Sequence, residues 1–299
     1  MKFEIIFLGT SCMVPTKDRN HPATFLSYNG EGILIDCGEN TQRQLKIAKI
    51  KPTQIKKILI SHWHGDHVLG LPGLLQTISS SDYSGVLEIY GPKGTKTFFE
   101  HMFKAFIFDK KVELKITEIK KSGKLIETDN YYIEAHKLNH RVTTYGFRII
   151  EKDRRRINVS FIKKLGIPDG PLLGDLQRGK DVTWKGKKVS YEKATYVVPG
   201  KKIGFIADTS MDNNCFKIAE DTDLLISEAT YEEELSEKAI EHMHLTSRDA
   251  AQIASRSNTK RLILTHLSQR YKSPEQIKKE AQTYFNNVDI AYDFMKAKP

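Results

Sequence analysis

The stretch Ser61-His62-Trp63-His64-Gly65-Asp66-His67 decides how this chain is interpreted. Four potential metal ligands fall within six residues: His62, His64, Asp66 and His67. The apolar run Ile58–Ile60 before them predicts a buried strand, and Val68–Leu75 after them predicts a helix. The cluster therefore lies where a strand ends and a loop opens, a common place for a site in an α/β protein. Imidazole and carboxylate ligands suit a divalent ion such as zinc, so the stretch indicates metal-assisted hydrolysis.

Three further polar residues follow predicted strands downstream. His140 comes after Tyr131–Leu138, Asp208 after Ile203–Ala207, and His266 after Arg261–Thr265. Seven ligands exceed the needs of one tetrahedral zinc but fit two metals that share a carboxylate. We expect Asp208 to be this bridge. We expect one ion to be bound by His62, His64 and His140, and the other by Asp66, His67 and His266.

The rest of the chain reads as a mixed α/β core. Further strands are predicted at Glu4–Leu8, Ala23–Tyr28, Gly32–Asp36, Leu87–Tyr90, Val112–Ile119, Tyr145–Glu151 and Asp223–Ser227. Helices are predicted at Thr41–Ala48, Gly94–Phe108 and Ser247–Ser257, and a last helix is expected to begin with Ser273 as N-cap and Pro274 at its first position. Thr246 or Ser247 is expected to cap the Ser247–Ser257 helix.

Bulk properties narrow the class of protein. The 299 residues suffice for one large domain or two small ones, and no apolar run approaches the roughly 20 residues that cross a bilayer. No secretory pattern is visible at the N-terminus, so we expect a cytoplasmic protein without a membrane partner. The three cysteines, Cys12, Cys37 and Cys215, form no CxxC pair and read as small hydrophobic residues.

Positive charge is concentrated in one segment. The net charge is +10, and residues 151–200 hold 12 Lys and Arg against 6 Asp and Glu, a net +6. Within them, Lys152–Tyr191 is rich in Gly and Pro, with Gly166–Gly174 at its centre. A loop of this length is unusual unless it is functional or disordered, and its interleaved apolar residues argue against simple disorder. The excess charge favours a polyanionic partner.

The order of these ligands resembles that of the metallo-β-lactamase superfamily. Within it, the chain is similar to the ribonuclease Z family over almost its whole length. The matching motifs are Phe7–Thr10, Ile35–Glu39, Ala207–Thr209, Ser227–Tyr231, His244–Thr246 and Thr265–Tyr271. One departure is Ser227, where the family often has His before the residue matched by Glu228.

The resemblance implies a fold and a site. The fold would be an αββα sandwich over residues 1–299, with residues 152–191 as an inserted basic flexible arm, an exosite for the tRNA body. His244 would be the general acid, Glu228 its support, and Asp66 both a ligand and the residue that orients the nucleophile. Arg270, Arg178 and Lys180 are the candidate RNA contacts. The metal content would be two Zn²⁺ per subunit, although Mn²⁺ or Fe²⁺ can use the same ligands.

The resemblance also implies an activity. The family removes the 3′ trailer from precursor tRNA, leaving a 3′-hydroxyl on the tRNA and a 5′-phosphate on the trailer, and works as a homodimer. Two alternatives remain open. One is a metallohydrolase acting on small substrates such as phosphodiesters, which would not need the basic arm. The other is a non-catalytic RNA-binding protein on the same fold, against which the complete ligand set argues.

Overall fold

The computed structural model describes residues 3–81 and 83–299. The chain divides into two compact units. The first contains the residues up to Ile126, Ile133–Ile149 and Lys202–Pro299, and the second contains Glu127–Tyr132 and Ile150–Lys201. Among the residues described, no helix combines the length and the apolar character needed to cross a bilayer.

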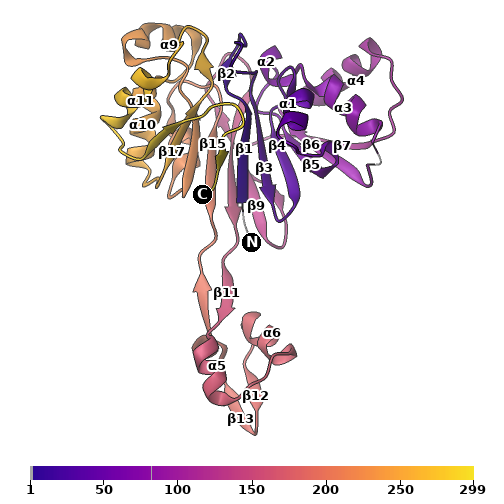
Figure 1. Ribbon diagram of the computed structural model, residues 1–299, viewed down its shortest axis with the longest axis vertical. Helices are drawn as coiled ribbons and strands as arrows, with labels where there is room; N and C mark the ends of the chain where they lie inside the picture. Colours follow the sequence, from indigo (N-terminus) through magenta and orange to yellow (C-terminus); the bar gives the residue numbers. More distant parts are fainter. Residues whose placement is uncertain (1–2, 82) are drawn as a thin grey trace. The chain divides into compact units, whose positions relative to one another are not determined.

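Two seven-stranded sheets form the frame of the first unit (Figure 1). The first sheet has the order β20 (Lys296–Ala297), β1 (Phe3–Gly9), β3 (Ala23–Tyr28), β4 (Glu31–Ile35), β5 (Ile55–Leu59), β6 (Val86–Gly91) and β7 (Glu113–Glu118). The second has the order β19 (Val288–Ile290), β17 (Leu262–Thr265), β16 (Leu224–Glu228), β15 (Lys202–Ile206), β10 (Thr144–Glu151), β9 (Tyr131–Leu138) and β8 (Gly123–Glu127). The short strands β2 (Ser11–Cys12) and β18 (Leu267–Ser268) pair in parallel.

Helices cover the outer face of each sheet, which gives the predicted αββα sandwich (Figure 1). On the first sheet they are α1 (Thr41–Ile47), α2 (Gly65–Val68), α3 (Leu71–Ser79) and α4 (Thr95–Ala105), and on the second α8 (Asn213–Ala219), α9 (Ser236–His242), α10 (Ser247–Arg256) and α11 (Glu275–Gln282). The 3₁₀ turns Pro52–Gln54 and Glu233–Leu235 complete the unit.

Alternation along β1 shows why the sheet is buried on both faces. Ile6 and Leu8 belong to the apolar cluster that packs under α1, α3 and α4. Ile5 and Phe7 are fully buried as well, and side chains one residue apart point to opposite faces of a strand. The strand therefore lies between a helical layer and the second sheet, which explains its almost continuous apolar sequence.

Two predicted elements differ from the structure. The helix predicted at Val68–Leu75 is two helices, α2 and α3, separated at Gly70. A Cβ at Gly70 would lie 2.0 Å from the carbonyl oxygen of Gly38, so the chain breaks where two backbones meet closely. At the last helix, Ser273 was predicted as N-cap, but Pro274 holds that position and α11 begins at Glu275. Thr246 does cap α10, as predicted, through a capping box with Asp249.

The second unit contains the basic segment and has its own small core. It comprises β11 (Arg154–Ile157), α5 (Val159–Leu165), α6 (Pro171–Gln177), β12 (Val182–Trp184), β13 (Lys187–Val189), α7 (Tyr191–Ala194) and β14 (Thr195–Val198). β11 and β14 form an antiparallel ribbon, and β12 and β13 form a hairpin. The buried core consists of Ile162, Ile167, Leu176, Val182, Val189 and Ala194. The apolar residues scattered through the basic segment are therefore the ones that fold it.

Candidate metal centre

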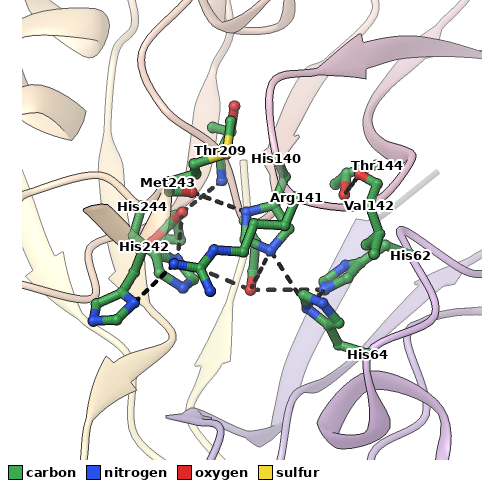
Figure 2. Close-up of polar contacts among 12 residues, drawn as sticks. His62, His64, His140, Arg141, Val142, Thr144, Thr209, His242, Met243 and His244 are labelled. Atoms are coloured by element: carbon green, nitrogen blue, oxygen red, sulfur yellow. Dashed lines mark hydrogen bonds and ion pairs between the residues drawn. The ribbon is translucent and has the colours of Figure 1, made fainter. Parts of the chain in front are cut away.

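The first group of candidate ligands brings three histidines and a carboxylate together. His62 and His64 come from the loop after β5, His140 follows β9 and Asp208 follows β15. His62 Nε2 lies 3.1 Å from His64 Nδ1, which in turn lies 3.4 Å from His140 Nε2 (Figure 2). Zn–N bonds of about 2.0–2.1 Å in tetrahedral geometry put ligand atoms roughly 3.3 Å apart. The spacing of these nitrogens thus fits one divalent ion.

The second group consists of Asp66, His67 and His266. His67 Nε2 lies 3.3 Å from His266 Nε2, and Asp66 Oδ2 lies 3.6 and 3.7 Å from these two nitrogens. Asp66 and His67 are on α2, whereas His266 follows β17 and has a left-handed φ of 58°. Two segments 199 residues apart therefore meet at one point.

Asp208 presents one oxygen to each group. Its Oδ2 lies 3.7 Å from His62 Nε2 and 4.0 Å from His140 Nε2, whereas its Oδ1 lies 3.5 Å from His67 Nε2 and 3.4 Å from His266 Nε2. Asp208 Oδ1 is buried and has no hydrogen-bond partner among the residues described. A buried carboxylate oxygen without a donor is costly. Two cations bridged by this carboxylate would remove the cost, so the site fits divalent metals.

Outer hydrogen bonds fix which nitrogen of His62 and His67 faces the centre. The Ser61 hydroxyl donates to Asp36 Oδ2 at 2.8 Å and lies 2.9 Å from His62 Nδ1, so it accepts the proton of that nitrogen. His67 Nδ1 donates to Asp36 Oδ2 at 2.8 Å. Asp36 thus supports both histidines and turns each Nε2 toward the centre, the usual arrangement around a metal.

His140 and His266 are oriented in the same way. His140 Nδ1 donates to the carbonyl oxygen of Met243 at 2.9 Å (Figure 2). The Thr230 hydroxyl donates to Glu228 Oε2 at 2.7 Å and accepts from His266 Nδ1 at 3.0 Å. Both histidines therefore offer Nε2, whereas His64 offers Nδ1.

The two groups differ in their electrostatics. Burial lowers the pKa of His62, His64 and His140, so these imidazoles are neutral and ready to bind a metal. Burial also disfavours charge on His67 and His266, but Asp208 and the other acidic groups around each imidazole together outweigh it and raise the pKa of both well above the usual value. Without a metal, protons supply the positive charge that the second group needs.

His244 and Glu228 lie beside the ligands. Glu228 is buried at the end of β16, where its Oε1 accepts from the Thr209 amide at 2.7 Å. His244 Nδ1 is 3.1 Å from both Glu228 oxygens and 3.9 Å from Asp208 Oδ2. Burial lowers the pKa of His244, but the Glu228 carboxylate opposes this and raises it to about 9. Since Glu228 occupies Nδ1, Nε2 is the nitrogen of His244 available for proton transfer.

An open cleft of about 490 Å³ gives access to the centre. Besides the candidate ligands His64, Asp66, His140 and Asp208, its lining includes Cys12, Met13, Arg141, Tyr231, His242 and His244. Sequence reasoning did not single out Met13, Arg141, Tyr231 or His242 as site residues. Adjacency was the available signal for two of them, because Arg141 follows His140 and Tyr231 belongs to the Ser227–Tyr231 motif.

The candidate RNA contacts lie in both units. The Arg270 guanidinium lies 5.1 Å from the centre of the Tyr231 ring, at the cleft lining. Arg178 and Lys180 are exposed in the second unit, where Arg178 Nη2 is paired with Asp175 Oδ1 at 2.7 Å. Asp175, within α6, therefore already compensates part of the charge of Arg178, which directly follows that helix.

Comparisons with known proteins identify the family of the chain. A family model described as the anti-Pycsar protein Apyc1 matches residues 3–155. The chain is 39% identical to a ribonuclease Z from Archaeoglobus fulgidus over 99% of its own length and 97% of the relative's. It is 38% identical to a ribonuclease Z from Bacillus cereus, with 97% of both chains covered.

Solved structures give the same result. The short form of human tRNase Z superimposes with a TM-score of 0.73 at 30% identity, covering 98% of each chain. The metallo-β-lactamase fold protein YhfI from Bacillus subtilis gives a TM-score of 0.72 at 19% identity, over 99% of each chain, which shows the shared fold. With nearly full-length relatives of 30% identity or more, the chain belongs to the ribonuclease Z family, and its fold is that of metallo-β-lactamase fold proteins.

Proposed function

We propose that this protein is a zinc-dependent endoribonuclease that removes the 3′ trailer from precursor tRNA. The products would be tRNA with a 3′-hydroxyl and a trailer with a 5′-phosphate. The observation that carries the proposal is the pair of ligand groups joined by Asp208, with the protonatable His244 beside them. The names and the nearly full-length similarity of the ribonuclease Z relatives support the substrate class.

The ligand groups would hold two zinc ions. His62, His64 and His140 would bind one, Asp66, His67 and His266 the other, and Asp208 would bridge them. When bound, the metals supply an activated nucleophile at neutral pH and neutralise charge on the phosphoryl oxygens. Asp66 lies at the cleft, where its carboxylate can orient the attacking water and accept its proton.

His244 would act on the leaving group. Attack on phosphorus breaks the bond to the ribose 3′-oxygen, and that oxygen leaves poorly without a proton. His244 Nδ1–H donates to Glu228, so the proton for the 3′-oxygen comes from Nε2. The Glu228 carboxylate favours the protonated imidazole, so His244 takes up a proton again after each turnover.

RNA binding would involve the second unit and the rim of the cleft. Lys180 and Arg178 of the second unit, with Arg270 at Tyr231, are proposed to contact phosphates, and such contacts carry little sequence information. We further propose a homodimer in which the basic unit of one subunit grips the tRNA processed by its partner. Action on precursor tRNA predicts a cytoplasmic location.

One incubation tests the proposal. Purified protein is mixed with a 3′-extended tRNA, with and without a chelator, and the cut is mapped by sequencing gel and by end-group analysis. A metal-dependent cut at the 3′ end of the mature tRNA, with metal analysis near two zinc ions per chain, is the expected result. Hydrolysis of a small phosphodiester together with intact precursor tRNA would instead favour the alternative, a phosphodiesterase of the same fold.

A further inference from the structure

We propose that His21 is a positioning residue for Asp66 and acts through the backbone of Met13. This inference deepens the proposed function, because it rests on Asp66 as a metal ligand. His21 is not among the candidate ligands, and the hydrogen bond of its side chain to Met13 links it to the centre.

The first step is a backbone donor aimed at a ligand. The Met13 amide donates to Asp66 Oδ2 at 2.9 Å. The same oxygen faces the second group, at 3.6 Å from His67 Nε2 and 3.7 Å from His266 Nε2. The amide therefore fixes the oxygen that points at the metal position and leaves Asp66 Oδ1 for the nucleophile.

The second step is that Met13 needs outside support to present this amide. Its φ is 53°, a left-handed conformation that is unfavourable for a residue with a side chain, and the Val14 amide closes a tight turn onto the carbonyl of Cys12. The Met13 side chain is 73% exposed and cannot anchor the turn by burial. Such strained residues persist only where their surroundings hold them in place.

His21 supplies that support. Its Nε2 lies 3.0 Å from the carbonyl oxygen of Met13, and a carbonyl requires the nitrogen to be the donor. The side chain is only 7% exposed, and its Nδ1 lies 3.8 Å from Glu39 Oε2. The Ser11 hydroxyl holds the other end of the turn by donating to the carbonyl of Val14 at 2.6 Å.

Two motif glycines make room for His21. A Cβ at Gly9 would lie 1.7 Å from the carbonyl oxygen of His21, and a Cβ at Gly38 would lie 2.5 Å from the Cβ of His21. Neither glycine contributes a ligand, but Gly9 belongs to the motif Phe7–Thr10 and Gly38 to the motif Ile35–Glu39. Without side chains, both glycines let His21 lie where its imidazole reaches the Met13 carbonyl, so these motifs shape the centre through His21.

The test compares His21→Leu with His21→Gln, which keeps a side-chain N–H donor. The first variant removes the support of Met13 and is expected to weaken binding of one of the two zinc ions about tenfold, within the range for outer-shell partners. We expect kcat to fall by a similar factor for precursor tRNA and for bis(p-nitrophenyl) phosphate, with KM within about twofold, because Asp66 and not RNA binding is affected. His21→Gln is expected to recover most of both losses. Zinc titration of the metal-free protein and steady-state kinetics provide the readouts.

Two further variants keep the test decisive. Incorporating the α-hydroxy acid analogue of Met13 replaces its amide by an ester. This removes the N–H that Asp66 accepts, keeps every side chain, and weakens only the Cys12 carbonyl as an acceptor for Val14, so it is expected to reproduce the losses even where His21→Leu fails to fold. His136→Leu, which deletes a half-buried histidine paired with Glu134, is the matched control and should change neither readout. Wild-type zinc affinity and kcat in the ester variant would overturn the inference. Failure of the wild-type protein to cut precursor tRNA would refute the proposed function instead, and zinc titration would still test His21.

Discussion

His244 Nδ1 lies 3.1 Å from each carboxylate oxygen of Glu228. This symmetric contact pairs an imidazole whose side chain is 11% exposed with a carboxylate that is only 1% exposed. Glu228 in turn accepts hydrogen bonds from the Thr209 amide and the Thr230 hydroxyl, so it cannot turn away. The pair thus holds a proton beside the metal ligands without being needed to complete either ligand group.

Removal of the His244 imidazole should slow cleavage of the phosphodiester bond and leave zinc and RNA binding unchanged. His244→Ala is expected to retain zinc and precursor tRNA binding while kcat falls by about 10²–10⁴-fold, the usual range for a general acid. Metal analysis, a gel-shift measurement and single-turnover cleavage separate these effects. Unchanged single-turnover cleavage would remove His244 from the mechanism.

The pH profile should identify the proton donor. Since the protonated form acts and Glu228 raises the pKa of His244, kcat should stay level through neutral pH and fall at alkaline pH. In Glu228→Gln, burial remains but the carboxylate does not, so the fall should begin at lower pH. An alkaline limb at the same pH in both proteins would show that another group is titrating.

The two ligand groups should bind zinc with different pH dependence. His67 and His266 have raised pKa values, so a metal must displace their protons, whereas His62, His64 and His140 have lowered pKa values and are already neutral. As pH falls from about 8 to 6, the zinc ion bound by Asp66, His67 and His266 should be lost before the other. Titrations of His266→Ala and His140→Ala, which each disable one group, assign the two affinities, and equal slopes against pH would contradict the prediction.

Removal of the basic unit should separate RNA binding from chemistry. Ile157 and Thr195 are paired residues of the β11–β14 ribbon, so an Asn-Gly turn between them replaces residues 158–194 without leaving an unpaired strand. Hydrolysis of bis(p-nitrophenyl) phosphate should be retained, while KM for precursor tRNA should rise at least about tenfold and its dependence on salt should weaken.

The matched control for that deletion reverses charge within the intact unit. Lys180→Glu and Arg178→Glu together should raise KM for precursor tRNA and leave the small phosphodiester unaffected. Equal loss of both activities after the deletion would show that the unit is needed for the structure of the centre.

The sequence predicted the ligand-bearing strands because their evidence is local. An apolar run followed by His or Asp indicates a buried strand that ends at a polar residue, and β5, β15 and β17 have this form, whereas β9 shows the alternation of a half-buried strand before His140. The strand β8 was missed because only Leu125 and Ile126 interrupt its polar sequence. Its pairing with β9 at the sheet edge, and not its own alternation, makes it a strand.

The missed parts of the site depend on contacts between distant segments. Met13 reaches Asp66 across 53 positions, and Cys12, predicted only as a small hydrophobic residue, lines the same cleft as the distant His244. Nothing in the residues around Met13 indicates that its amide faces a ligand. The capping error at Ser273 has a similar origin in backbone geometry, because Pro274 adopts the N-cap position with φ −84° and ψ 4°.

Gly70 offers a stability test of such a distant contact. In Gly70→Ala, the new Cβ would meet the Gly38 carbonyl oxygen at 2.0 Å, and neither backbone can yield without moving α3 or the Ile35–Glu39 segment. We expect the free energy of unfolding to fall by about 1–3 kcal/mol, as in overpacked cores, measured by urea denaturation of the metal-free protein. Gly65→Ala is the matched control, since its Cβ would meet only the end of the Leu69 side chain at 3.2 Å and an alanine favours a helix. If both variants unfold at the same urea concentration as the wild type, the close approach at Gly70 does not cause the break between α2 and α3.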